Sequence, residues 1–229
     1  DGADFVETLV GADAIPETSI IAAVGFYGDK LRIGHGSAGG WDVFGPRRSI
    51  TSSQANVLFE LDGEPALDLY ERYLGEDESK GLPGTALLFP LLLRDPLRND
   101  HEVVRTVLAI DREARSMTFA GDIPQGWTAQ LMRGNFDRLS QGAGDAARAA
   151  SGDGLGAGTG LSVMISCIGR RLLMGQRIHE ELGAALAELP DQMPNIGFYS
   201  YGEISPHAAS GFCELHNQTM TVMTLREAA

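Results

Sequence analysis

The sequence predicts a mixed α+β or α/β fold with largely antiparallel sheets and about three helices packed on them. Many short apolar runs are separated by turn residues, as in strand-to-strand hairpins. Only three segments space their apolar side chains three or four residues apart, which is typical of helices. The order of these patterns is not the regular strand–helix alternation of a parallel sheet.

The first fifty residues show strand patterns only. Residues 19–27 form a continuous apolar run, a Gly-Asp turn follows, and residues 30–34 alternate polar with apolar side chains. We therefore expect a hairpin here. Residues 36–46 are rich in glycine and are expected to form a loop.

The remaining strands are predicted from short runs rich in apolar and β-branched residues. They are expected at residues 55–62, 86–93, 103–110, 116–120, 128–132, 161–168, 196–201 and 218–225. Residues 76–84 and 205–211 are polar or rich in turn residues, and we expect both segments to be loops.

Three helices are expected between these strands. The first covers residues 65–74, because proline fits the first turn and the apolar residues lie on one face. Asn135 is a suitable N-cap for the second helix, over residues 136–150. The third ends at Leu189, just before Pro190.

Charge and composition exclude some classes of partner. Eighteen basic and 31 acidic residues give a net charge of −13. Such a surface repels nucleic acid and anionic membranes, since both are bound largely through neutralised phosphates. The longest apolar run, residues 86–93, is too short to span a bilayer. Two cysteines make no disulfide framework in 229 residues, so we expect a cytoplasmic protein.

Polar and aromatic groups gather near the C-terminus, in residues 197–206 and 214–221. These residues and Cys213 supply aromatic rings, two carboxylates, an imidazole, an amide and a thiol. Two core strands need only apolar alternation, so this density of polar groups predicts a site. Gly169-Arg170-Arg171 follows another predicted strand, and guanidinium groups there are suited to holding a carboxylate in two hydrogen bonds.

The remaining motifs fit other chemistries less well. The glycine run at residues 152–160 follows a helix and precedes a strand, the reverse of a phosphate-binding loop, so we interpret it as a connector. His207, Cys213 and His216 are spaced too widely for the usual zinc pattern. A Cys213–His216 nucleophilic pair lacks an identifiable orienting group. His101 and His179 are expected to be solvated.

Five motifs resemble the FIST family. They are residues 60–75, 118–124, 167–171, 197–206 and 214–221. By this resemblance, residues 53–229 correspond to the family's C-terminal domain, and residues 1–52 to the tail of its N-terminal domain. The family is regarded as a bacterial sensory input module of signal-transduction proteins, often joined to histidine kinase, cyclic-dinucleotide or chemotaxis output domains. Some members resemble haem-based nitric-oxide sensors.

The resemblance implies a non-enzymatic sensor that binds an amino acid or similar small carboxylate, without a cofactor, and signals through a partner such as a histidine kinase. The expected pocket uses residues from the two densest motifs: Arg170, Tyr199, Tyr201, Glu203, His216 and Asn217. In this hypothesis, Arg170 holds a carboxylate and Glu203 an ammonium group. The alternatives are a haem-binding sensor with His216 as axial ligand, an enzyme using Cys213 or Glu203, and an interaction domain in which Asn217 and Thr219 cap buried strand ends.

Overall fold

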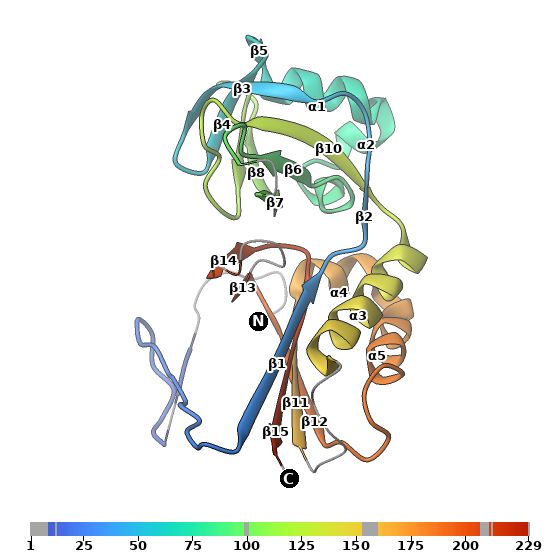
Figure 1. Ribbon diagram of the computed structural model, residues 1–229. Coiled ribbons are helices and arrows are strands. Elements are labelled where there is room, and N and C mark those ends of the chain that lie inside the picture. The colour runs from blue at the N-terminus through green and yellow to red at the C-terminus, as the bar shows by residue number, and fades with distance from the viewer. Residues whose placement is uncertain are drawn as a thin grey trace.

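The computed structural model describes residues 9–11, 13–98, 101–152, 160–206, 211 and 213–228, which form two lobes (Figure 1). The upper lobe in that view contains residues 46–133, and the lower lobe contains the other described residues. The chain enters the upper lobe through β2 (Trp41–Val43) and leaves it at the end of β10 (Thr128–Gly134). These two strands pair antiparallel, so a two-stranded ribbon connects the lobes.

The lower lobe is built on a four-stranded sheet in the order β1-β15-β11-β12. Its strands are β1 (Leu31–Ala38), β15 (Met220–Glu227), β11 (Gly160–Cys167) and β12 (Asn195–Ser200). β15 pairs antiparallel with β1 and β11, whereas β11 and β12 are parallel. Parallel strands need a crossover connection. Here it consists of α4 (Ile168–Met174), the 3₁₀ helix Gly175–Arg177 and α5 (Ile178–Leu186).

One face of this sheet is covered by helices (Figure 1). Alternate side chains of β11 and β15, including Met164, Met220 and Val222, pack against a row of alanines on α3 (Phe136–Ser151). Small side chains let the helix approach the sheet closely. At the closest point, a Cβ atom added to Gly36 on β1 would lie 2.1 Å from the carbonyl oxygen of Ala146.

We expect Gly36→Ala to lower the free energy of unfolding by about 1–3 kcal/mol, because the added methyl group meets helix backbone that cannot yield without moving α3. Urea denaturation followed by circular dichroism measures the change. Gly183→Ala on α5 is the matched control: no heavy atom lies within 4 Å of the added Cβ, so alanine should stabilise the helix by about 0.5–1 kcal/mol. Equal midpoints for Gly36→Ala and the parent protein would contradict the close packing of α3 on β1.

The upper lobe is an antiparallel sheet with short helices. The strand order is β7-β6-β10-β3-β4-β9-β8, with β2 beside β10 and β5 beside β4. The additional strands are β3 (Arg48–Gln54), β4 (Val57–Leu61), β5 (Glu64–Pro65), β6 (Leu91–Arg94), β7 (Glu102–Arg105), β8 (Val107–Asp111) and β9 (Ser116–Phe119). The helices are α1 (Ala66–Leu74), α2 (Glu76–Lys80) and the 3₁₀ helix Gly84–Leu88. Leu67, Leu69 and Tyr70 of α1 are buried in the core of this lobe.

Two features occupy the junction between the lobes. A hairpin of β13 (Glu203–Pro206) and β14 (Cys213–His216) lies at the top of the lower lobe (Figure 1). Beside the connecting ribbon, Leu92 and Met132 of the upper lobe share an apolar cluster with Leu139 and Met174 of the lower lobe and with Trp41. The lobes are therefore packed against each other.

The predicted fold class and the best-marked helices are confirmed. α1 begins after Pro65 and ends at Gly75. Asn135 caps α3, where its side-chain oxygen accepts hydrogen bonds from the backbone N–H groups of Asp137 (3.0 Å) and Arg138 (3.4 Å). The third helix is divided into α4 and α5, because Gly175 adopts a φ of +52° that ends the first part.

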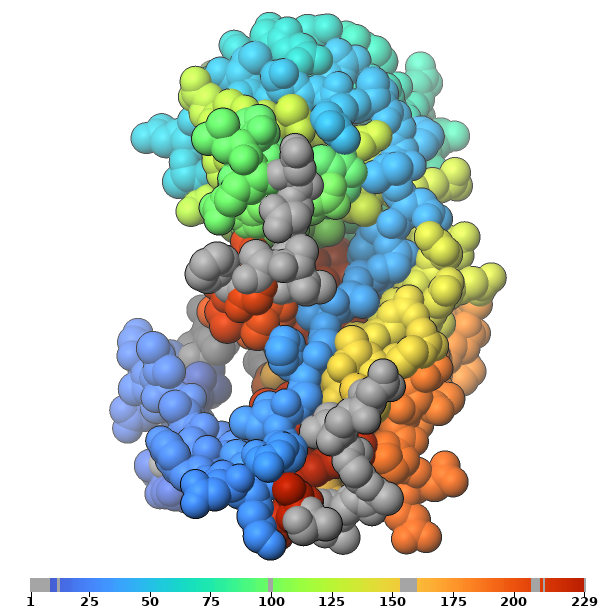
Figure 2. All heavy atoms as spheres, viewed as in Figure 1, coloured from blue at the N-terminus to red at the C-terminus, as the bar shows by residue number. Residues whose placement is uncertain are grey.

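The predicted hairpin at residues 19–34 is wrong. Residues 20–28 have no regular structure, and β1 pairs along its whole length with the C-terminal strand β15. The apolar run is left exposed, with Ile21 96% and Tyr27 94% accessible. Figure 2 shows residues 13–30 as a blue body that projects from the side of the lower lobe. An apolar run alone thus did not determine the pairing partner.

Smaller differences have local causes. The expected strand at 86–93 starts only at Leu91, because a 3₁₀ helix precedes Pro90, which has no N–H group for a ladder. The strand at 103–110 is divided at Thr106 into β7 and β8. Three expected loops contain regular structure: residues 36–46 contain the end of β1 and all of β2, 76–84 contain α2, and 205–211 begin inside β13. Residues 207–210 and most of the glycine run lie outside the described residues.

Candidate functional site

Several strand ends converge at the junction between the lobes. The carboxyl ends of the parallel strands β11 and β12 lie at the same edge of the lower sheet, where ligands often bind in α/β proteins. The start of β15 and the β13–β14 hairpin lie at this edge as well. They bring together a set of buried or half-buried polar residues that we call the junction cluster: Cys167, Ser200, Glu203, Gln218 and Thr219.

Glu203 supplies the carboxyl group of this cluster. The residue is 3% exposed. Its Oε1 accepts a hydrogen bond from Ser200 Oγ (2.8 Å), and its Oε2 accepts one from Thr219 Oγ1 (2.9 Å). Burial raises the pKa of Glu203 to about 7, although both hydroxyl groups and the charge of Arg170 act in the opposite direction. Among the described residues, no basic side chain hydrogen-bonds this carboxyl group.

Gln218 supplies an amide in an unusual backbone conformation. Its φ is +62°, a left-handed value that non-glycine residues adopt mainly where the surrounding structure imposes it. Its carbonyl oxygen accepts hydrogen bonds from Trp41 Nε1 (3.0 Å) and Arg170 Nη1 (3.1 Å). The side chain is fully buried against Gly169, and neither Nε2 nor Oε1 has a hydrogen-bond partner among the described residues. A buried amide without partners is costly, so its retention points to a ligand.

Cys167 lies near the backbone of Gln218 and the carboxyl group of Glu203, but it is not an activated nucleophile. Burial raises the pKa of its thiol to about 11, and the nearby charge of Glu203 adds to this effect. The side chain is therefore a neutral thiol near neutral pH. Since the thiolate is the reactive form, this position is unsuited to covalent catalysis.

Arg170, predicted as a carboxylate clamp, is fully buried and already occupied by protein acceptors. Its Nε pairs with Glu181 Oε1 at 2.5 Å, and its Nη2 donates to the carbonyl oxygen of Leu139 at 2.8 Å. Its Nη1 donates to the carbonyl oxygens of Gly39 and Gln218. Arg170 thus joins α5, α3 and the segment before β2, and it fixes the backbone of Gln218.

The two predicted tyrosines lie away from Glu203. Ser200 contacts Glu203, so the preceding residue of β12, Tyr199, points to the opposite face of the sheet. There the guanidinium group of Arg171 lies 5.1 Å from the centre of the Tyr199 ring. Tyr201 follows the strand and is 38% exposed. Neither ring lines the junction cluster.

His216 and Asn217 belong to the hairpin side of the junction. His216 is opposite Glu203 in the β13–β14 pairing, and its Nε2 is hydrogen-bonded to the carbonyl oxygen of Ser205 (3.2 Å). Asn217 is 1% exposed, and its Oδ1 accepts a long hydrogen bond from the backbone N–H of Thr106 in the upper lobe (3.4 Å). Asn217 therefore bridges the lobes.

Two upper-lobe residues that the sequence analysis missed also hold the hairpin. His101 Nε2 lies 2.7 Å from Glu214 Oε2, which corrects its interpretation as a solvated residue. Arg105 Nη1 donates to the carbonyl oxygen of Leu215 (3.1 Å). These residues are far from the hairpin in sequence, and no local motif marks them. The hairpin is thus held to β7 and its neighbourhood by side chains from both lobes.

The alternative chemistries receive little geometric support. Cys213 and His216 are three residues apart on one strand, so their side chains point to opposite faces of β14. The part of the chain that the structure describes contains no group of histidine, cysteine or carboxylate residues arranged to hold a metal ion. The Nε2 atom of His216, one of the two ring nitrogens able to bind haem iron, is hydrogen-bonded to the carbonyl oxygen of Ser205.

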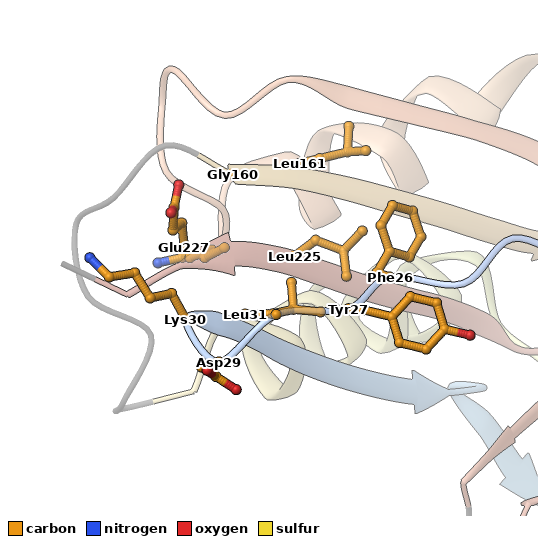
Figure 3. A pocket seen from close by; sticks show the side chains of 11 residues that line it. Phe26, Tyr27, Asp29, Lys30, Leu31, Gly160, Leu161, Leu225 and Glu227 are labelled. Atoms are coloured by element: carbon orange, nitrogen blue, oxygen red, sulfur yellow. The ribbon is translucent and has the colours of Figure 1, made fainter.

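A hollow lies elsewhere on the lower lobe. It measures about 630 Å³ and lies at the end of the sheet where β11 begins and β15 ends. Figure 3 shows Phe26, Leu161 and Leu225 within it, with Lys30 and Glu227 at its end. It contains none of the six predicted site residues. We favour the junction cluster, because that cluster combines buried polar groups with an unpaired amide.

Comparison with family models decides the relationship of this chain to known proteins. The model of the FIST C domain matches residues 66–206, and the model of the FIST N domain matches residues 1–64. The chain belongs to the FIST family. FIST domains are sensory domains of signal transduction. No curated protein and no solved structure matches this chain. The expected boundary of the FIST domains after residue 52 stays a prediction.

One further property bears on its setting. Among the described helices of this FIST protein, none has the length and apolar character needed to cross a membrane.

Proposed function

We propose that this FIST protein is a non-enzymatic sensor that binds an amino acid, or a similar small carboxylate, at the junction cluster. The observation that carries the proposal is the unpaired, buried amide of Gln218, whose neighbour Thr219 hydrogen-bonds Glu203, a carboxyl group that no basic side chain of the described residues hydrogen-bonds. A ligand ammonium group fits Glu203, and a ligand carboxylate fits the Nε2 of Gln218.

This proposal keeps part of the sequence-based site. Glu203 remains the ammonium acceptor. Arg170 acts through the backbone of Gln218, because its own donors are occupied. His216 and Asn217 belong to the hairpin side of the junction, which moves in this proposal. Tyr199 and Tyr201 do not contact the proposed ligand.

The β13–β14 hairpin can transmit ligand binding to the upper lobe. Glu203 begins β13. On β14, Leu215 and Glu214 contact Arg105 and His101 of the upper lobe. Asn217, just after β14, contacts Thr106. Because Glu203 is buried, a ligand enters only when the hairpin moves relative to these contacts. Binding therefore changes how the two lobes meet, and an output protein such as a histidine kinase in the cytoplasm would read that change.

Isothermal titration calorimetry with the twenty amino acids tests the proposal, together with an amine and a carboxylate that each lack the second group. We expect at least one amino acid to bind, and its one-group analogues to bind at least tenfold more weakly. Glu203→Gln and Gln218→Leu should each weaken binding about 10–100-fold, since each removes a hydrogen bond to a charged ligand group.

Glu64→Gln is the control, because this glutamate pairs with Arg72 at the surface of the upper lobe and takes no part in the hairpin contacts. It should leave the affinity within about threefold of the parent value. Unchanged affinity in both Glu203→Gln and Gln218→Leu would show that a ligand binds elsewhere. An absence of binding by every amino acid would reject the ligand class.

A further inference from the structure

A second candidate site lies at the β12 edge of the lower sheet. It is a groove of about 280 Å³ between β11, β12 and α5, which we call the edge groove. Its lining includes Met164, Ser166, Leu182, Phe198, Tyr199 and Met220. β12 is the last strand of the described sheet, so one side of its backbone has no ladder partner there and borders the groove.

The floor of the edge groove is apolar and contains sulfur. Met164 and Met220 are buried beneath it, and Leu182 of α5 forms one wall. Phe198, 60% exposed, lies at the mouth. Thioether sulfur and aromatic rings attract each other, and methionine adapts its shape to irregular ligands. These residues favour a flat, aromatic ligand body.

A fully buried polar atom lies behind this lining. Ser166 Oγ is 3.2 Å from Glu181 Oε1, while Glu181 Oε2 has no hydrogen-bond partner among the described residues. The carboxylate is neutralised by Arg170, with which it forms an ion pair at 2.5 Å. A ligand with one neutral N–H or O–H donor therefore suits the groove better than a cation. Ser166 is the side chain placed to relay that hydrogen bond.

We propose that the edge groove binds small aromatic molecules that carry one neutral hydrogen-bond donor, a class that includes indole and phenol. The volume suits a one- or two-ring ligand, since an apolar cavity of about 150 Å³ already holds benzene. The site is separate from the junction cluster, because none of the five residues of that cluster lines the groove. It also gives a role to Tyr199, which the amino-acid site leaves outside.

Methyl NMR of protein labelled at methionine, titrated with indole, tests the proposal. We expect saturable shifts of the Met164 and Met220 methyl signals, whereas Met117, buried in the upper lobe, should not shift. Naphthalene, which lacks the donor, should bind at least fivefold more weakly. Ser166→Ala should weaken indole binding by a similar factor.

Two tryptophan substitutions on one helix provide the control. Leu182→Trp fills the edge groove and should abolish the shifts, whereas Leu186→Trp, one turn along α5 and outside the lining, should preserve them. Glu203→Gln should leave indole binding unchanged, which separates this site from the amino-acid site. Absence of shifts at the solubility limit of indole, or shifts that persist in Leu182→Trp, would overturn the proposal.

Discussion

Replacing Glu181 by alanine is expected to lower the free energy of unfolding by about 3–5 kcal/mol. Both members of the Arg170–Glu181 pair are fully buried, and Arg170 has no second acidic partner among the described residues. Removal of the carboxylate leaves a guanidinium charge inside the protein without compensation. The same change withdraws an acceptor from the residue that fixes Gly39, Leu139 and Gln218. Urea denaturation monitored by tryptophan fluorescence measures the loss.

The exposed ion pair of Glu188 with Arg148 is the matched control. Glu188 follows α5, and its side chain is 32% exposed, so Glu188→Ala should change the midpoint little. The double variant Arg170→Met/Glu181→Leu removes both charges and should be more stable than Glu181→Ala alone. If Glu181→Ala and Glu188→Ala unfold at the same urea concentration, the buried pair does not stabilise the lower lobe.

Stability should fall as the pH rises from about 4.5 to 7, because of Glu203. Its pKa is raised from 4.5 in the unfolded chain to about 7 in the folded protein. Between these two pKa values the unfolded chain has lost the proton while the folded protein keeps it, so the free energy of unfolding falls as the pH rises. A shift of this size corresponds to about 3 kcal/mol. The penalty is absent below pH 4.5 and complete above about pH 7.

Comparison with Glu203→Gln isolates this effect from the other titrating groups. The neutral amide removes the ionisation, so the stability of the variant minus that of the parent should increase across this pH window and level off above it. Urea denaturation at half-unit steps from pH 4 to 8 gives the difference. A difference that stays constant with pH would contradict the burial of an ionisable carboxyl group at this position.

The sequence predicted those parts of the fold that depend on local chemistry. Asn135 and the apolar stripe after it define α3, and Pro65 and Gly75 mark the limits of α1, since caps and periodicity act within a few residues. The hairpin prediction for residues 19–27 failed because strand pairing depends on distant residues. The apolar run satisfies a strand pattern, but the partner of β1 is β15, almost two hundred residues away. Pairing at that distance has no local signature.

The candidate site could likewise be predicted only where it depends on local sequence. Glu203, His216 and Asn217 were visible as a dense polar motif, and the structure places all three at the junction. The buried state of Arg170 was not visible, because its acceptors are carbonyl groups of distant segments and a glutamate one helix away. The positive φ of Gln218 also depends on tertiary contacts with Trp41 and Arg170. A sequence supplies the chemical groups, but the orientation of each group is fixed by contacts with distant residues.

The ribbon of β2 and β10 between the lobes has a mechanical consequence. A pair of hydrogen-bonded strands resists shear within its own plane and bends readily out of that plane. The upper lobe is therefore expected to rotate about one axis, and such a rotation changes the contacts between the hairpin and the upper lobe. With rotation about a single axis, one angle describes the orientation of the upper lobe relative to the lower lobe. A downstream protein that contacts each lobe at one place is then sufficient to detect a change in this angle.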